Sequence, residues 1–159
     1  MSIESTVLPM LRPDGAKVEA KVEWEAANYL KCRVSIDCDG KVSGGRRIDY
    51  FDALEEARLP FEAEGYRLLC YGASLNVFPS GMGRSCGLRM ESYQFREKGP
   101  KGSKIIFETG KDVIPATVKE QRLFYLKWRN KNESEEVEYD DSVFQWQIEL
   151  YLKADKNLQ

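Results

Sequence analysis

Strict alternation of apolar and charged side chains near the N-terminus constrains the fold more than any other feature of the sequence. Between Lys17 and Glu25 every second residue is apolar, and the same pattern returns at residues 30–37. The inward positions are Val18, Ala20, Val22 and Trp24 in the first run, and Leu30, Cys32, Val34 and Ile36 in the second. A period of two residues is that of a half-buried β-strand. The short link at 26–28 predicts a hairpin, and Asp39-Gly40 and Gly44-Gly45 predict turns.

The pattern changes to helical spacing after the second turn. Apolar residues between Asp49 and Glu64 recur every three to four positions, which predicts a helix with Asp49 or Asp52 as its N-cap. Pro60 should bend or shorten this helix, because proline removes one backbone hydrogen bond. Gly65 is placed to end it.

The remainder of the chain predicts short strands, a second helix and a closing strand. We expect strands at 66–71, 75–78, 87–95 and 104–108, with a turn at 98–103. Thr117 and Glu120 have the spacing of a capping box, so a helix should run from Val118 to about Asn130. Its buried residues should be Val118, Phe124, Tyr125 and Trp128. Alternation from Phe144 to Lys153 predicts the last strand.

These elements predict one α+β domain covering residues 1–159. Its sheet should be mostly antiparallel, with two helices packed on one face and the other face partly solvated. No internal repeat or linker divides the sequence.

The composition excludes several classes of catalytic and metal site. The chain has no histidine, which excludes Ser-His-Asp and Cys-His catalysis and the usual zinc sites. A net charge of -2 and a pI near 5.4 disfavour direct nucleic-acid binding. We therefore expect no enzyme activity, no cofactor and no metal. With no long apolar run or signal peptide, we expect a cytoplasmic protein that does not enter a membrane; its oligomeric state stays open.

The four cysteines are predicted to be free thiols. Cys32, Cys38, Cys70 and Cys86 are widely spaced, and none belongs to a C-x-x-C pair. A small secreted disulfide scaffold would carry a denser framework.

An acidic run after the second helix is the first candidate site. Such a run is often a solvated loop, but it can also dock a basic partner, with Tyr139 as an aromatic anchor. The residues assigned to partner binding are Glu133, Glu135, Glu136, Glu138, Tyr139, Asp140 and Asp141.

A glycine-rich loop at 79–87 is the alternative site. Asn76, Ser80, Arg84 and Ser85 could line a polar pocket for a small anion or nucleotide. The loop lacks the lysine and hydroxyl of a nucleotide P-loop, so a turn between strands is the favoured explanation. The carboxylates of Asp37, Asp39, Asp49 and Asp52 could form a catalytic or metal pair, but turns and helix caps explain them more simply.

The sequence from Asp49 onward resembles a family of small, mostly uncharacterised bacterial proteins. The matching segments are Phe51–Leu54, Leu68–Ala73, Asn76–Met82 (NVxPSGM) and Ile106–Tyr125 (IFxTGxDVxPATVxEQxxFY). That family is similar to immunity proteins of bacterial toxin systems such as contact-dependent inhibition. The resemblance implies a protein that binds and blocks a cognate toxin domain, with a basic nuclease as the expected target. A small-ligand-binding or enzymatic domain using the loop from Asn76 to Gly87, or a structural subunit of a bacterial assembly, are the alternatives.

Overall fold

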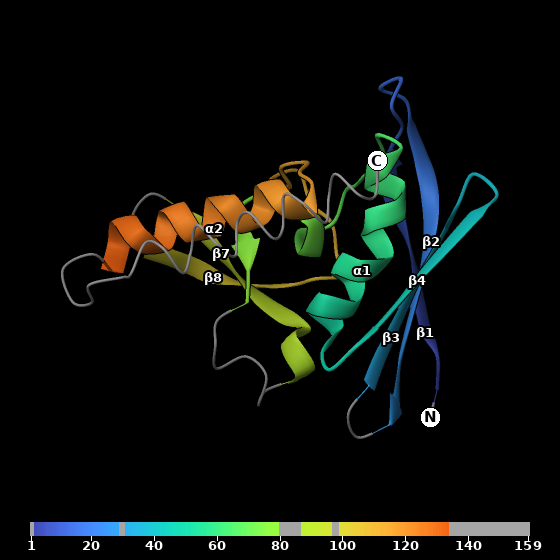
Figure 1. Ribbon diagram of the computed structural model, residues 1–159, viewed down its shortest axis with the longest axis horizontal. Helices are drawn as coiled ribbons and strands as arrows, with labels where there is room; N and C mark the ends of the chain where they lie inside the picture. The colour runs from blue at the N-terminus through green and yellow to red at the C-terminus, as the bar shows by residue number, and fades with distance from the viewer. Residues whose placement is uncertain (1, 29–30, 80–86, 97–98, 134–159) are drawn as a thin grey trace.

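Five antiparallel strands form the larger of two sheets. The computed structural model describes residues 2–28, 31–79, 87–96 and 99–133. The strands are β1 (Glu4–Leu11), β2 (Lys17–Asn28), β3 (Lys31–Cys38), β4 (Lys41–Arg47) and the short β5 (Arg67–Leu68). Their order in the sheet is β4-β3-β2-β1-β5 (Figure 1).

The predicted alternation sets the two faces of this sheet. Val22 pairs with Ile36 and Trp24 with Val34, and all four side chains are buried. Their charged neighbours point to the opposite face, where Arg33 donates to Glu25 at 2.8 Å. The predicted turn at Asp39-Gly40 is confirmed, because both residues have positive φ (54° and 76°), as a tight type I′ hairpin turn requires.

Helix α1 (Tyr50–Ala63) covers the apolar face of the sheet (Figure 1). Asp49 is its N-cap, as predicted, and Asp49 Oδ1 accepts the N–H of Asp52 at 2.8 Å. Gly65 (φ +91°) ends the helix, and the N–H of Tyr66 returns to the Phe61 carbonyl at 3.0 Å. The Phe61 and Tyr66 rings pack edge to face at 5.7 Å, which completes a Schellman motif.

A second, three-stranded sheet carries the second helix. Its strands are β6 (Val77–Phe78), β7 (Glu91–Arg96) and β8 (Gly99–Ile105), and two short 3₁₀ turns accompany them, η1 (Tyr71–Ala73) and η3 (Gly87–Arg89). Helix α2 (Val118–Glu133) lies along this sheet, at the other side of α1 from β1 to β4 (Figure 1). Tyr125 stacks on Phe78 at 4.3 Å and Trp128 lies 4.3 Å from Phe95. The α+β class and the antiparallel pairing are confirmed, with the strands divided between two sheets.

One N-terminal strand was not predicted, and one predicted turn is wrong. The sequence did not indicate β1, because Pro9 interrupts an irregular apolar run; β1 tolerates this proline because its N–H position faces away from β2. The predicted turn at Gly44-Gly45 lies inside β4. Gly45 is needed there because a Cβ atom would lie 2.9 Å from the Glu56 side chain of α1. It would also overlap the α1 backbone at Ala53.

Other element boundaries also shift. Pro60 does not end α1, which continues past it to Ala63. The link at 26–28 lies inside β2, and the predicted turn at 98–103 lies mostly inside β8. The predicted strands at 66–71, 75–78, 87–95 and 104–108 become β5, β6, β7 and the end of β8. The predicted strand at 144–153 lies outside the described residues.

Three of the four predicted free thiols can be placed. Cys32, Cys38 and Cys70 are buried and unpaired, as predicted, while Cys86 lies outside the described residues. Burial raises the pKa of Cys70 to about 11. These thiols therefore stay protonated at neutral pH and pack as small apolar groups.

Candidate interaction surface

A buried arginine joins α2 to α1. The side chain of Arg58 in α1 is only 1% exposed, yet its donors find acceptors on three sides. Its Nε donates to Glu62 at 2.7 Å, its Nη1 to Gln121 Oε1 at 2.7 Å and its Nη2 to the Ala116 carbonyl at 3.1 Å. A buried guanidinium is tolerated only when it is paired and hydrogen-bonded in this way. The network therefore fixes where α2 begins.

Gln121 completes the network from the α2 side. It is fully buried, and its Nε2 donates to the carbonyls of Ser74 at 2.9 Å and Val77 at 2.7 Å. The sequence predicted Phe124 as an inward residue of this helix. In the structure Gln121 takes the inward position and Phe124 is half-buried, because backbone carbonyls of the turn before β6, not apolar side chains, face α2 here.

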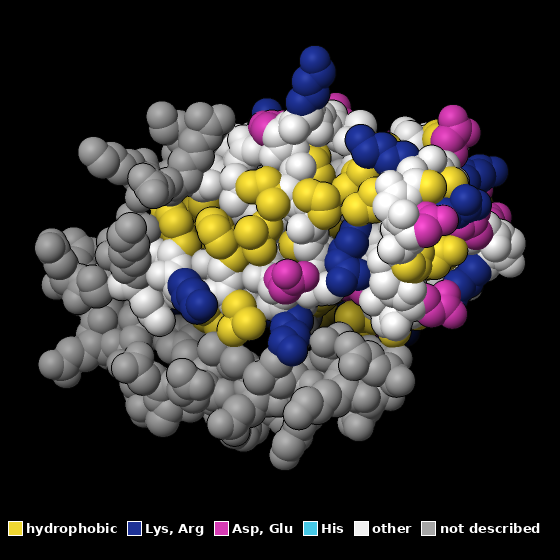
Figure 2. Space-filling view, turned by 90° about the horizontal axis from the view of Figure 1, so that it is seen from above, with side chains coloured by type: hydrophobic (Ala, Val, Ile, Leu, Met, Phe, Trp, Pro, Cys, Tyr) yellow, Lys and Arg dark blue, Asp and Glu magenta, His cyan; other side chains and the backbone are white. Residues whose placement is uncertain are grey.

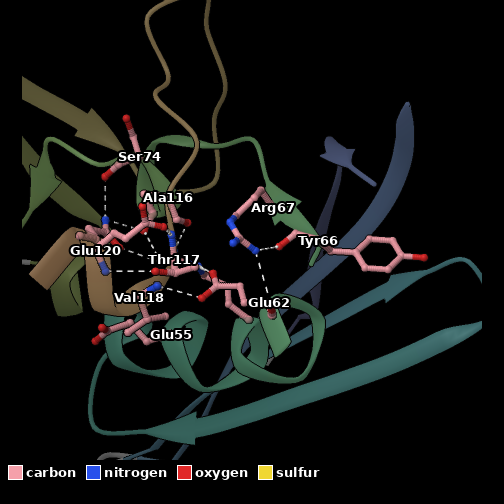
Figure 3. A network of polar contacts seen from close by, with 12 residues as sticks. Glu55, Glu62, Tyr66, Arg67, Ser74, Ala116, Thr117, Val118 and Glu120 are labelled. Atoms are coloured by element: carbon pink, nitrogen blue, oxygen red, sulfur yellow. Dashed lines mark hydrogen bonds and ion pairs between the residues drawn. The ribbon is translucent and has the colours of Figure 1, made fainter. Parts of the chain in front are cut away.

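The first turn of α2 is capped from two directions (Figure 3). The predicted capping box is confirmed: Glu120 N–H donates to Thr117 Oγ1 at 3.1 Å, and Thr117 N–H donates to Glu120 Oε1 at 3.0 Å. Glu62 of α1 accepts the N–H of Val118 at 2.8 Å. Burial raises the pKa of Glu62, although the charge of Arg58 opposes this shift.

A second ion pair holds the next turn of α2. Arg122 donates to both carboxylate oxygens of Glu55, at 2.9 and 2.6 Å. Bidentate pairs of this kind fix orientation as well as distance. Glu55, Arg58 and Glu62 therefore hold the first two turns of α2 against α1.

The segment before α2 is anchored independently. Tyr71 donates to Asp112 Oδ1 at 2.6 Å and Gln94 to Asp112 Oδ2 at 2.9 Å. These hydrogen bonds lower the pKa of Asp112 to about 2. The N–H of Ile114 donates to Ser74 Oγ at 2.9 Å, so the segment from 112 to 115 is held in one conformation.

This anchored segment presents apolar side chains outward. Ile114 is 42% exposed and Pro115 is exposed beside it. The N–H of Leu75 donates to the Ile114 carbonyl at 2.9 Å, which brings a half-exposed leucine next to them. Ile114, Pro115 and Leu75 are called the apolar band below.

Charged side chains border the apolar band. Figure 2 shows hydrophobic side chains gathered across the face on which α2 lies, with lysine, arginine and acidic groups at the margin. Lys111 before the band and Glu120 and Lys127 on α2 are exposed. An apolar centre with a polar rim is typical of a protein-binding surface. The sequence analysis missed it, although the apolar trio at 113–115, in a polar stretch, was a signal.

The structure describes little of the predicted acidic site. Glu133 is the last residue of α2, and the positions at 135, 136 and 138–141 lie outside the described residues. The acidic run therefore continues directly from the C-terminal end of α2.

In the alternative loop site only Asn76 can be placed. Its Nδ2 donates to the Phe95 carbonyl at 3.0 Å, and its Oδ1 accepts from Ser74 at 3.1 Å. Asn76 therefore ties the turn before β6 to β7. Ser80, Arg84 and Ser85 lie outside the described residues.

Two of the four carboxylates considered for a catalytic pair have local structural roles. Asp49 caps α1, while Asp39 accepts from Arg12 at 2.8 Å and from Tyr66 at 2.9 Å. Within the described ranges, no group of three thiols and carboxylates could hold a metal ion. The two described helices include none with the length and apolar character needed to cross a bilayer.

Comparison with models of known protein families finds none that matches this chain, and comparison with curated proteins finds no relative.

Proposed function

We propose that this chain is an immunity-type protein that binds a cognate bacterial toxin domain through the apolar band and blocks it by occlusion. The observation that carries the proposal is the band itself. Ile114 and Pro115 are exposed and Leu75 is half-exposed, while the backbone beside them is held by the hydrogen bonds of Gln121 and Asp112. A surface that is already ordered loses little conformational entropy when a partner binds.

The acidic run supports a basic partner. It follows α2 directly in the sequence, so a partner that covers α2 along its length would reach the end of the helix from which the run begins. A nuclease that grips phosphates presents a cationic surface, and acidic residues on this chain would steer that surface during encounter. Occlusion needs no catalytic residue on the inhibitor. The family resemblance of the sequence points in the same direction.

The first test is rescue of growth. The chain should be co-expressed with the toxin domain encoded beside its gene, and the purified pair should associate at a fixed ratio. Ile114→Glu should weaken binding by about ten-fold or more, because it places a charge in the desolvated centre of the interface. Val42→Glu is the matched control, since Val42 is 68% exposed on β4, away from the band. Equal effects of the two changes would contradict the proposed surface.

The second test separates encounter from anchoring. Neutralising Glu135, Glu136, Asp140 and Asp141 should slow association and reduce its salt dependence, while dissociation changes little. Tyr139→Ala should instead speed dissociation, as loss of an aromatic anchor does. No rescue of any toxin, together with turnover of a small substrate by the isolated protein, would refute the immunity function.

A further inference from the structure

Among the residues that the structure describes, the outer edge of β1 has no strand partner over most of its length. β1 pairs with β2 from Glu4 to Leu11, but on its other side β5 reaches only Met10 and Leu11. The N–H of Leu69 donates to the Pro9 carbonyl at 2.9 Å, so the backbone groups of Pro9 point away from β2. Every second residue of a strand points its backbone groups to the same side. Ile3, Ser5 and Val7 therefore direct their N–H and C=O groups outward, and no described residue bonds them.

Between Ile3 and Val7 the outward positions of this edge carry neither a charged side chain nor a proline, and no described segment covers them. Proteins commonly shield an open edge with charged side chains, proline or a covering segment. Ile3 and Val7 are 54% and 58% exposed, and Ser5 between them is also exposed and uncharged. The opposite edge of the sheet differs, because the N–H of Arg46 in β4 donates to the Glu56 carboxylate at 3.1 Å.

We propose that β1 pairs, antiparallel, with β1 of a second copy of this chain across a two-fold axis at Ser5. Ile3 would then lie opposite the partner subunit's Val7, and Ser5 opposite the partner subunit's Ser5. These are the positions whose backbone groups face outward, so each opposed pair exchanges both N–H···O bonds. Two exposed apolar side chains on each copy would cover each other on one face of a continuous sheet.

The sequence of the edge selects this register. With Ser5 at the axis, Glu4 lies opposite the partner subunit's Thr6, so no like charges are directly opposed. A register centred on Glu4 would place two carboxylates face to face, which is unfavourable. Pro9 ends the pairing, because it has no N–H and its carbonyl is already bonded to Leu69. The free edge is thus self-complementary over Ile3 to Val7, which favours a second copy over an unrelated strand.

The dimer edge and the apolar band are separate surfaces. Figure 1 places β1 and α2 at opposite ends of the molecule, with α1 between them. The dimer proposal therefore does not depend on the immunity function. Because a single added strand buries a modest area, we expect a dimer that dissociates on dilution.

Sedimentation or light scattering of the full chain across a concentration series tests the dimer. The mass should approach twice the 18.3 kDa of the chain at high concentration and fall on dilution. Val7→Lys and Ser5→Pro should both give a monomer, the first by placing charge opposite Ile3 and the second by removing an outward N–H. Neither change removes a β1–β2 hydrogen bond, so circular dichroism should show a folded protein. Val42→Lys, an equally exposed change on β4, should leave the dimer intact.

Amide hydrogen exchange tests the register. The amides of Ile3, Ser5 and Val7 should exchange about ten-fold or more slowly at high than at low concentration. A monomer at every concentration, or a dimer unaffected by Val7→Lys, would overturn the proposal. Protection of these amides that persists on dilution would also overturn it, because another segment of the same chain, such as 144–153, would then cover the edge.

Discussion

The buried amide of Gln121 offers the sharpest test of how α2 is held. Gln121→Met keeps the side-chain volume but removes the acceptor of Arg58 and the donor to the Ser74 and Val77 carbonyls. A hydrogen bond to a charged group contributes about 1.5–3 kcal/mol, and each neutral one about 1 kcal/mol. Arg58 Nη1 retains a contact with the Gly72 carbonyl at 3.2 Å, which limits the loss. We expect the free energy of unfolding to fall by about 3 kcal/mol, a large share of the 5–15 kcal/mol typical of a domain.

Urea denaturation measures this loss. The slope of the transition should stay constant while its midpoint falls. Lys127→Met, an exposed change on the same helix, should shift the free energy of unfolding by about 0.5 kcal/mol or less. Hydrogen exchange should show that the amides of α2 lose more protection than those of β2 and β3. A loss below about 1 kcal/mol for Gln121→Met would mean that the network does not hold α2 in place.

An isosteric change tests the direction of the hydrogen bonds. Gln121→Glu retains an acceptor for Arg58, but its second oxygen faces the carbonyls of Ser74 and Val77 without a proton to donate. Burial and these carbonyls should raise the pKa of the introduced carboxyl in the folded state. The deficit in stability should therefore be full at neutral pH and shrink as the pH falls toward 5 and the carboxyl gains a proton. A deficit that grows on acidification would refute the assigned hydrogen-bond geometry.

Substitutions at Gly45, Thr117 and Cys70, with controls, test three further local features. Gly45→Ala should lower the free energy of unfolding by about 2 kcal/mol or more, because the added Cβ meets the α1 backbone. Gly44→Ala is the control: its Cβ would make only an ordinary contact at 3.6 Å, so the free energy of unfolding should change by about 0.5 kcal/mol or less in the same urea titration. Thr117→Ala should cost about 0.5–2 kcal/mol, whereas Thr117→Ser keeps the cap and should cost less. Burial raises the pKa of the Cys70 thiol from 9.0 to about 11. The protonated thiol therefore contributes fully to the free energy of unfolding below pH 9, and this contribution is lost as the pH rises toward 11. Stability measured over that range should fall, and Cys70→Ala should reduce the fall.

The parts of the fold visible in the sequence are those with one solvated face. β2 and β3 alternate because the charged face of the sheet meets water, so Val22 and Trp24 stand out against Lys21 and Glu23. The caps at Asp49 and Thr117 are local, and a few residues specify them completely. Such features depend on neighbours along the chain, which a single sequence displays.

The division into two sheets depends on contacts between distant segments. β5 and β6 have two residues each, too few to show a period. Gly45 occupies a strand position because α1 packs closely against β4 there. The sequence does not reveal this contact between distant segments. The apolar band joins Leu75 to Ile114 and Pro115 from two separate segments; the apolar residues at 113–115 are a local signal for one part of it, but the position of Leu75 beside them is not visible in the sequence. The acidic run and most of the glycine-rich loop remain predictions, because they lie outside the described residues.

Described residues at 71–76 and 112–121, which belong to three of the segments that carry the resemblance, are joined by hydrogen bonds near the start of α2. Tyr71 bonds Asp112, Asn76 bonds the backbone of β7, and Gln121 bonds the carbonyl of Gly72 at 3.1 Å. A substrate site would need the polar atoms of these residues to reach a ligand, but here they are already bonded to the protein. Their arrangement stabilises the position of α2 and of the segment carrying Ile114. A motif made of such residues would therefore specify the shape of a binding surface, and the specificity for a partner would reside in the exposed side chains that this framework presents.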